Sequence, residues 1–517
     1  MPASKAGKSW KITKRWLYWI HRWTGIVLCI LFAMWFVSGM VMMYVPFPSF
    51  REAERVSVAA PIDWNKVRIG PDAALAQLDG EAFPEEMRLE MTGGEPVYRV
   101  SAENGRRALS ARTGQEIRDI DKPRAMQIAE TMTGKPAREA ELVEHDQWVV
   151  TRAFAHLAPF WRVRMDDGAG TDVYVTRETG EIVQNTERWE RFWNWLGAVP
   201  HWIYFEALRL YQEPWRQTVI WTSGVGIVGS ILGIWIGILR IRLRKRYKSG
   251  AVSPYRGWMK WHHIAGLIGG LFLVTWVFSG WLSMSPFGGF GNGDGSNIRK
   301  RYAGEQGSRF APTDLALLAR RAAGARELRF VHVAGQPIIV IVDANNGGLA
   351  LNGRTADPIR PTREAIVAHA QQAVNGRLLD AQFLTKHDIY WYATGDPRRD
   401  GRPLPVWRLR FGDAFGSWLY IEPSTGLLLA QSNEGARTYR WMFSALHSFD
   451  LPILLEHRPI RDALMILLSI AGLIVSVSGI VVGWRYLRTG KSGRAPPRRA
   501  AADRRAAVAP MKAVGPE

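Results

Sequence analysis

Four uncharged apolar runs constrain the fold of this 517-residue chain more than any other feature. A transmembrane helix needs about 20 consecutive apolar residues to cross roughly 30 Å of hydrocarbon. The runs are Ile26–Val45, Val219–Leu239, Ile264–Met284 and Ala463–Trp484. We therefore expect a membrane α-helical protein with a bundle of four spans. About 25 residues precede the first run and no small-residue cleavage site follows it, which favours a retained anchor over a signal peptide.

The net charge of +20 is concentrated beside these runs. The basic residues gather in three segments, Met1–Arg22, Arg240–His263 and Arg485–Glu517. These segments hold 23 of the 67 Lys and Arg residues and two of the 47 Asp and Glu residues, so they carry +21 and the rest carries −1. By the positive-inside rule they are cytoplasmic, as are both termini, and residues 46–218 and 285–462 lie outside the cytoplasm. The charge is thus an orientation signal that also favours contact with anionic membrane lipid, and no nucleic-acid partner is expected.

The two halves of the chain repeat each other. At an offset of 241 the matches are His21 with His262, Gly25 with Gly266, Trp35 with Trp276, and Ser38-Gly39 with Ser279-Gly280. At an offset of 246 they are Arg191 with Arg437, Trp195 with Trp441, His201 with His447, Gly226 with Gly472, Gly233 with Gly479 and Gly237 with Gly483. This pattern predicts two tandem repeats, each consisting of a helix, an external domain and a second helix.

Each external segment is expected to form a small α+β domain. Strand-like runs at Thr171–Thr176 and Ser417–Ile421 end in turns that contain glycine, and Pro71–Leu78 and Pro312–Ala322 have helical patterns. The tail after Gly490 is rich in Pro, Arg and Ala and is expected to be disordered. The predicted boundaries are 1–45 (N-terminus and first span), 46–218 (first external domain), 219–239 (second span), 240–263 (basic loop), 264–284 (third span), 285–462 (second external domain), 463–484 (fourth span) and 485–517 (tail).

Four of the eleven histidines occupy copied positions, His21 with His262 and His201 with His447. The first pair lies at the cytoplasmic ends of two spans, each histidine four residues before a glycine on the same helical face, which leaves room for a flat macrocycle. The second pair lies outside, in aromatic segments typical of interfacial helices. A span of about 20 residues at 1.5 Å each separates the pairs by about 30 Å, so one iron cannot use both.

Two His–His haem sites, one for each leaflet, fit this count of ligands. Because the chain has a single cysteine, Cys29, and no Cys-x-x-Cys-His motif, any haem is b-type. An iron–sulfur cluster held by protein thiolates is excluded for the same reason. Cys29 is interpreted as a small buried apolar residue. The copied Ser38-Gly39 and Ser279-Gly280 are interpreted as close-packing positions between helices.

Other histidines leave alternatives open. His263 competes with its neighbour as a ligand, and the repeat alone favours His262. His145-Asp146 and His387-Asp388 also recur in the external domains, where either a structural turn or a substrate or metal contact would explain them.

Three motifs together resemble the PepSY-associated transmembrane family. They are His21-Arg-Trp-Thr-Gly25 followed by Phe36-Val-Ser-Gly39, Leu446-His447 before the last span, and Tyr-Val-x-x-x-Thr-Gly-Glu at Tyr174–Glu181. The resemblance extends to about Leu487. It implies an inner-membrane protein with PepSY-like periplasmic domains, associated with iron uptake, and some members are haem-containing ferric-siderophore reductases. By this resemblance His21, His262, His201 and His447 match the family's histidine positions and would be axial ligands of two b haems that pass electrons to a ferric chelate.

One-electron reduction is a sound way to release iron from a hard-oxygen chelate, because Fe(II) attracts anionic oxygen less strongly than Fe(III) does. No Gly-rich dinucleotide motif follows a strand on the cytoplasmic side, so the electron donor is expected to be a membrane quinol or a separate reductase. An alternative is a non-enzymatic module whose external domains bind a partner or inhibit a protease. A transporter is least favoured, because the spans contain neither charges nor interior prolines.

Overall fold

The computed structural model describes residues 5–490, except 78–83, 85, 103–104, 289, 291–294, 305–309, 311–313, 345–346, 396 and 398–399. The chain divides into two compact units. We call them the helical unit (1–37, 221–278 and 463–517) and the sheet unit (38–220 and 279–462). The predicted disordered tail after Gly490 lies outside the described residues.

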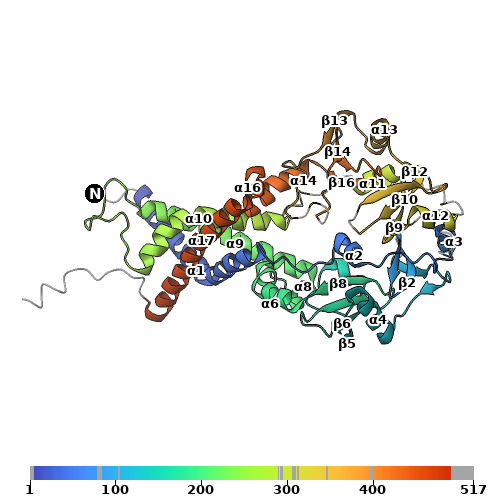
Figure 1. The fold of residues 1–517 in the computed structure, drawn as a ribbon. Coiled ribbons are helices and arrows are strands. Elements are labelled where there is room, and N and C mark those ends of the chain that lie inside the picture. Colours follow the sequence, from blue (N-terminus) through green and yellow to red (C-terminus); the bar gives the residue numbers. More distant parts are fainter. Residues whose placement is uncertain are drawn as a thin grey trace, which may run out of the picture. The chain divides into compact units, whose positions relative to one another are not determined.

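The helical unit is built from four long helices (Figure 1). They are α1 (Lys5–Met42), α9 (Gln212–Arg240), α10 (Trp258–Ser283) and α17 (Arg458–Thr489). Each is long and apolar enough to cross a membrane, over Ile12–Met42 in α1 and over the full length of the other three. The four predicted apolar runs fall on these helices, although Val45 and Met284 lie just beyond the helix ends. The helices are longer than the apolar runs and include flanking polar residues.

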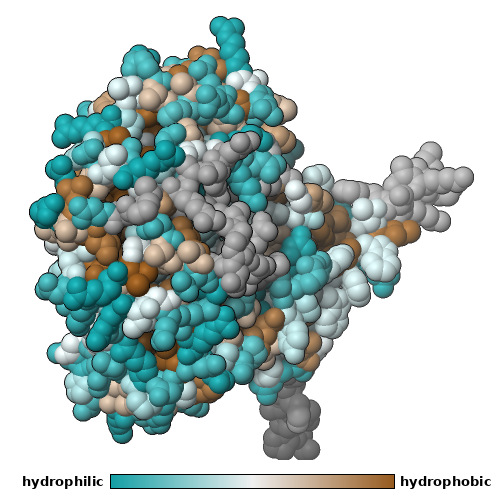
Figure 2. Space-filling model, turned by 90° about the vertical axis from the view of Figure 1, so that its right-hand side faces the viewer, coloured by the Kyte–Doolittle hydropathy of each residue, from teal (hydrophilic) through white to brown (hydrophobic). Residues whose placement is uncertain are grey.

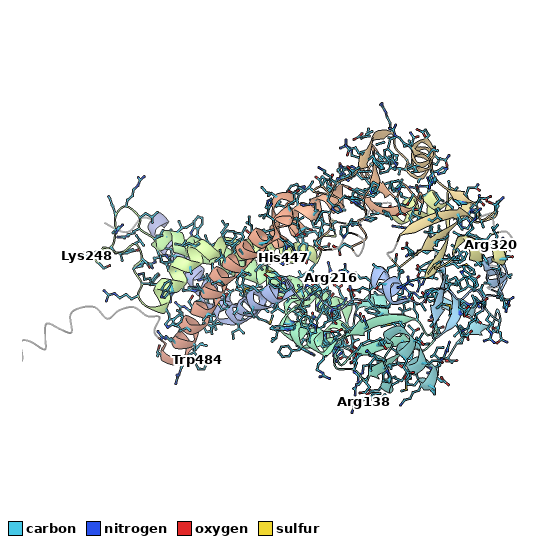
Figure 3. All side chains as sticks on the ribbon, viewed as in Figure 1. Arg138, Arg216, Lys248, Arg320, His447 and Trp484 are labelled. Carbon is cyan, nitrogen blue, oxygen red and sulfur yellow. The ribbon has the colours of Figure 1, made fainter. Side chains whose placement is uncertain are left out.

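The surface of the helical unit is apolar. About 28% of the most apolar window of each helix is buried within the protein, so most of its side chains face outward. Trp261 is 63% exposed, and Trp484, labelled in Figure 3, is 61% exposed. Exposed apolar surface of this extent is typical of a lipid-facing bundle. Inside, small residues allow close packing, since a Cβ on Gly269 would lie 3.2 Å from the backbone of Ala471.

The sheet unit contains sixteen described strands in three antiparallel sheets (Figure 1). The first-segment strands are β1 (Glu86–Thr92), β2 (Glu95–Ala102), β3 (Gly105–Ser110), β4 (Glu116–Ile117), β5 (Ala137–Val143), β6 (Phe160–Met165), β7 (Asp172–Thr176) and β8 (Ile182–Thr186). The second-segment strands are β9 (Glu327–Val333), β10 (Gln336–Val342), β11 (Gly348–Asn352), β12 (Pro358–Ile359), β13 (Leu378–Leu384), β14 (Val406–Phe411), β15 (Trp418–Ile421) and β16 (Leu428–Ser432). Strands β5–β8 and β13–β16 form separate four-stranded sheets in that order.

Short helices connect and cover these sheets. They are α2 (Glu52–Val58), α3 (Pro71–Ala76), α4 (Lys122–Thr133), α5 (Arg152–Ala155), α6 (Arg188–Leu196), α7 (Ala198–His201), α8 (Glu206–Arg209), α11 (Gly295–Ala303), α12 (Leu315–Arg321), α13 (Arg363–Ala373), α14 (Glu434–Tyr439), the π-helix η1 (Arg440–Ala445), α15 (Leu446–Ser448) and α16 (Pro452–Glu456). Helix α4 shows why the boundaries fall where they do. The Asp121 side chain accepts a hydrogen bond from the backbone of Arg124, and Gly134, with φ of 66°, ends the helix.

The local predictions for the external segments are largely confirmed. The runs at Thr171–Thr176 and Ser417–Ile421 form β7 and β15, and the turns after them place Gly180 and Gly426 at positive φ. Most of the coloured surface in Figure 2 is hydrophilic, as expected for a water-exposed face. The aromatic segment before α9 is helical, as predicted.

The prediction of two separate external domains is wrong. Strand β1 pairs with β9, so the two segments share one eight-stranded sheet of order β12-β11-β10-β9-β1-β2-β3-β4. In this pairing Arg88 lies directly opposite Arg329. The sheet is covered by a core with residues of both segments, among them Tyr98 and Phe330. Each half-sheet would otherwise leave an unpaired edge, and the pairing satisfies both edges.

Buried charges surround this junction. Arg88 Nε lies 3.1 Å from Glu90 Oε2, and the same guanidinium pairs with Glu181. Arg55 bridges Glu90, at 2.6 Å, and Glu327. All three carboxylates are buried, so their pairing with arginine replaces the hydration that folding removes.

This cluster predicts a loss of stability in acid. Burial by itself raises the pKa of Glu90, Glu181 and Glu327, but the neighbouring arginines outweigh it and hold each pKa below its ordinary value. A carboxyl group whose pKa is lower in the folded state stabilises the fold at pH values above its unfolded-state pKa of about 4.3. This stabilisation is lost as the pH falls below that value. We expect the melting temperature in detergent, followed by tryptophan fluorescence, to be insensitive to these carboxylates between pH 7 and about pH 5 and to fall as the pH is lowered below about 4.3.

The variant Glu327→Gln tests whether this cluster of buried carboxylates causes the loss of stability in acid. It should destabilise the protein at neutral pH by about 1–3 kcal/mol, because it removes one of the two carboxylates that pair with Arg55 and with Arg329. It should also weaken the acid dependence. The same substitution at exposed Glu144 is the control and should change neither property. Equal acid dependence in Glu327→Gln and the wild type would contradict the assignment.

Candidate functional site

The first histidine pair meets inside the helical unit. His21 on α1 and His262 on α10 have ring centres 6.2 Å apart and ring planes inclined by 32°. Their Nδ1 atoms are held by backbone carbonyls, His21 by Gly229 O at 3.0 Å and His262 by Val475 O at 3.1 Å. Ser478 Oγ is a second neighbour of His262 Nδ1, at 3.3 Å. A histidine fixed in this way through Nδ1 presents Nε2 as a ligand.

A cavity of about 540 Å³ surrounds these two rings. This volume lies within the roughly 300–1,000 Å³ typical of cofactor sites. Glycines from all four helices line it: Gly25, Gly226, Gly229, Gly233, Gly237, Gly266, Gly270, Gly479 and Gly483. A Cβ on Gly266 would meet no atom within 4 Å, and one on Gly25 would meet only Cys29 Sγ, at 3.9 Å. The open space therefore begins at the glycines one turn after each histidine.

Polar groups also line the cavity. Arg22 and Arg240 border it, and Arg22 Nη1 donates a hydrogen bond to the Tyr486 hydroxyl at 2.8 Å. Arginine is well suited to hold carboxylates such as the propionates of a haem. Ser230 Oγ is buried in the wall without a hydrogen-bond partner, which costs free energy unless a ligand engages it.

The second pair meets within the sheet unit. His201, at the end of α7, and His447, in α15 and labelled in Figure 3, have ring centres 6.1 Å apart and ring planes inclined by 75°. Each Nδ1 lies 3.0 Å from a buried serine hydroxyl, Ser38 Oγ for His201 and Ser279 Oγ for His447. The Phe443 ring stacks on His447 at 4.9 Å with planes 18° apart.

A glycine lies against each of the four rings. A Cβ would come within 2.6 Å of His21 Cε1 at Gly233, 3.2 Å of His262 at Gly479, 3.3 Å of His201 at Gly39 and 3.5 Å of His447 at Gly280. At Gly233 such a contact requires the ring to move, and at the others it is tight or close. These copied glycines leave space for the imidazoles, a role that the sequence interpretation missed. The copied serines were likewise interpreted only as packing residues, although their equal spacing of 17 residues from His21 and His262 was a detectable signal.

The structure brings His262, and not His263, to face His21. His263 is buried with both ring nitrogens engaged, Nδ1 with Ser253 Oγ at 2.8 Å and Nε2 with Gly237 O at 3.0 Å. Its ring therefore links α10 both to α9 and to the loop between these two helices. This geometry supports the preference for His262 that the repeat provided.

The other copied dipeptides have structural contacts. Asp146 accepts hydrogen bonds from the Tyr174 hydroxyl at 2.8 Å and from the backbone of Trp148 at 3.0 Å. Asp388 accepts from the backbones of Tyr390 and Trp391, both at 2.9 Å. These contacts favour the turn interpretation for both aspartates.

Both histidine pairs have the spacing that a shared metal requires. Two imidazole nitrogens, each about 2 Å from one metal, place the ring centres roughly 6 Å apart. The measured separations are 6.2 and 6.1 Å. Within the described residues, no cluster of three or more His, Cys, Asp or Glu side chains could hold a bare ion. The His21–His262 pair, which lies beside a cavity of about 540 Å³, therefore fits an iron macrocycle.

These features define a membrane protein with four long apolar helices, paired histidines and an antiparallel sheet unit. The chain belongs to the family described as "PepSY-associated TM region", whose model matches residues 18–323, more than half of the chain. The predicted resemblance is thereby confirmed. The matched residues include His21, His201 and His262, and His447 lies beyond them. No curated protein matches the chain.

Proposed function

We propose that this protein is an inner-membrane haem b electron-transfer protein that reduces a ferric siderophore or similar ferric chelate in the periplasm. The observation that carries the proposal is the pairing of the four copied histidines, with ring centres 6.2 and 6.1 Å apart. The axial ligands would be His21 with His262 at one site and His201 with His447 at the other. Bound haem would supply reversible one-electron chemistry at iron.

The proposal includes a tandem-repeat architecture. The copied partners support it, because Gly229 and Val475, which hold the first pair, are 246 positions apart, and Ser38 and Ser279, which hold the second, are 241 apart. The charge distribution supports cytoplasmic termini and a periplasmic sheet unit.

The chain's own residues would position and insulate the sites. With Nε2 as the ligand, each Nδ1–H donates to its carbonyl or serine oxygen, which fixes the tautomer and the ring orientation. The glycines keep the cavity open. Arg22 and Arg240 would neutralise carboxylates at the cavity wall. A ligand set that does not change with oxidation state limits rearrangement during electron transfer.

The test is oxidation of the reduced protein by a ferric chelate. The purified, dithionite-reduced protein should show a haem b spectrum with two haems per chain. Adding a ferric siderophore with a ferrous-iron trap should reoxidise the haem and release trapped Fe(II) in equal amount. The gallium(III) complex of the same siderophore is the control, because Ga(III) cannot accept the electron, and it should leave the haem reduced.

Other outcomes would refute parts of the proposal. A preparation that folds but binds no haem would contradict the cofactor assignment and favour the binding or protease-inhibitory module. Haem that remains reduced with every ferric chelate would contradict the substrate class alone.

A further inference from the structure

The two segments of the sheet unit carry opposite net charge. Residues 38–220 contain 22 Lys and Arg and 28 Asp and Glu, a net charge of −6. Residues 279–462 contain 22 Lys and Arg and 17 Asp and Glu, a net charge of +5. The number of basic residues is the same, so the difference lies in the carboxylates. An anionic ligand is therefore attracted to the second segment and not to the first.

Two of the carboxylates that differ can be located on the four-stranded sheets, β5–β8 and β13–β16 (Figure 1). Residues opposite each other on antiparallel strands share a face of the sheet. In the first sheet one row of such residues is Glu139, Arg164 and Asp172, and the next row is Glu141, Arg162 and Tyr174. In the second sheet the same rows are Asp380, Arg410 and Trp418, and Gln382, Arg408 and Tyr420. Trp418 and Gln382 thus stand in place of carboxylates, whereas both arginines are kept.

The row that contains Asp172 shows what the replaced carboxylate does. Asp172 Oδ2 lies 3.4 Å from Nη1 of Arg191, on α6. The corresponding arginine of the second segment is Arg437, on α14, whose guanidinium carbon lies 4.2 Å from the centre of the Trp418 ring. Two more guanidinium groups lie over this ring, those of Arg408 at 5.2 Å and Arg410 at 5.7 Å. An indole attracts cations through its π-electrons but carries no net charge, so three arginines share a neutral partner.

Arg437 is less fully neutralised than Arg191. Both Nη atoms of Arg191 donate hydrogen bonds to protein oxygens. Arg437 Nη2 donates to Gly416 O at 2.9 Å, but its Nη1 is buried without a hydrogen-bond partner among the described residues. Burial lowers the pKa of Arg437, and nearby Glu434 offsets this effect only in part. A buried guanidinium in this state costs free energy, which an added anion would recover.

Cationic and aromatic groups of this cluster reach the solvent. The Arg410 side chain is 38% exposed. Trp441, in η1, is 42% exposed, and the Arg440 guanidinium carbon lies 5.0 Å from the centre of its ring. Trp441 Nε1 donates to the Tyr390 hydroxyl at 3.3 Å, and the Tyr390 ring meets Trp418 edge to face at 5.0 Å. Flat rings beside guanidinium groups suit a ligand that combines negative charge with aromatic rings.

We infer that Arg410, Arg437, Trp418 and Trp441 form a binding site for an anionic metal chelate with aromatic ligand groups, namely a tris(catecholate) complex. Such a complex of a trivalent metal carries three negative charges and presents three flat rings, and a guanidinium fork can hold its paired oxygens. A tris(hydroxamate) complex is neutral and gains nothing from the charge of this segment. The inference rests on the proposed function and names the class of ferric chelate that the protein would reduce. It concerns binding alone, so no electron or bond is transferred in this step.

Titration calorimetry of the full-length protein in detergent tests this site with gallium(III) complexes. Ga(III) matches the charge of Fe(III) but accepts no electron, so binding is measured apart from electron transfer. We expect the tris(catecholate) complex to bind at least about tenfold more tightly than the neutral tris(hydroxamate) complex, and its binding to weaken as the NaCl concentration rises. Equal affinity for the two complexes, or no binding of the tris(catecholate) complex, would overturn the inference. A protein that binds this complex but contains no haem would instead contradict the proposed function.

Arg410→Gln and its counterpart on the first sheet locate the site. Arg410→Gln should weaken binding of the gallium tris(catecholate) complex about tenfold, because it removes a charged donor that the ligand can reach. Arg164→Gln removes the arginine in the same row of the first sheet, where the side chain is 46% exposed, and should leave the affinity unchanged. Equal weakening by both substitutions would mean that binding reflects overall charge and that no site exists at Arg410.

Restoring the carboxylates tests the role of their replacement. Trp418→Asp recreates the row of the first sheet, so the new carboxylate should neutralise Arg437 and weaken binding at least about tenfold. Gln382→Glu restores the other carboxylate beside Arg408, whose Nη2 lies 2.7 Å from Gln382 Oε1, and should weaken binding in the same direction. It keeps the test open if Trp418→Asp fails to fold. Unchanged affinity in a folded variant would overturn the inference.

Discussion

Replacing His21 or His262 by alanine is expected to reduce the haem content from two per chain to one, and replacing His201 or His447 should remove the other haem. The reason is geometric. Each pair has ring centres about 6 Å apart, so one iron can bind both rings, and loss of either imidazole removes an axial ligand. Haem extraction and quantification, together with the reduced-minus-oxidised spectrum, provide the measurement. The two members of a pair should give the same residual spectrum.

Two neighbouring histidines serve as controls. His263→Ala should retain both haems, because His263 hydrogen-bonds through both ring nitrogens to Ser253 and Gly237. His457→Ala should also retain both, since His457 is exposed and its Nδ1 lies 2.9 Å from Ile453 O. Loss of haem from His263→Ala with full retention in His262→Ala would show that the ligand was assigned to the wrong residue.

Filling the cavity should have an equally large effect without removing a ligand. Gly266→Phe is expected to abolish haem binding at the His21–His262 site, because position 266 faces open space in the cavity where the macrocycle would lie. The chain should still fold, since an aromatic ring that enters an apolar cavity buries surface rather than exposing it. One haem per chain should remain, with the spectrum of the His201–His447 site.

Matched substitutions distinguish a block of the haem cavity from a general loss of folding. Gly266→Ala adds a methyl group that meets no atom within 4 Å, so both haems should remain. Gly168→Phe places the same ring on an exposed loop of the sheet unit and should also retain both. Full haem content in Gly266→Phe would mean that the cavity is not the cofactor site.

Much of the site follows from the sequence, because the repeat marks the residues that matter. The length of the apolar runs and their lack of charge located the four apolar helices, and the offsets of 241 and 246 selected four of the eleven histidines. The strands β7 and β15 and the glycine turns after them were also predictable from local chemistry. What these features share is that each depends on neighbours within a few residues, or on a copied pattern.

The remaining features depend on contacts between distant residues. Nothing local in β1 indicates that it pairs with β9, some 240 positions away, or that Arg88 meets Glu181. The carbonyls that hold His21 and His262 carry no side-chain signal, because any residue presents the same backbone oxygen.

Because the two halves share one sheet, neither half is expected to be stable when it is expressed separately. Expressing either half alone would uncover the edge of β1 or of β9, with backbone donors and acceptors that require a partner. Two identical copies of a half could satisfy those edges by pairing with each other, much as β1 and β9 do. Truncated versions should therefore be recovered as homodimers or aggregates rather than as stable monomers, and size-exclusion chromatography would distinguish these products.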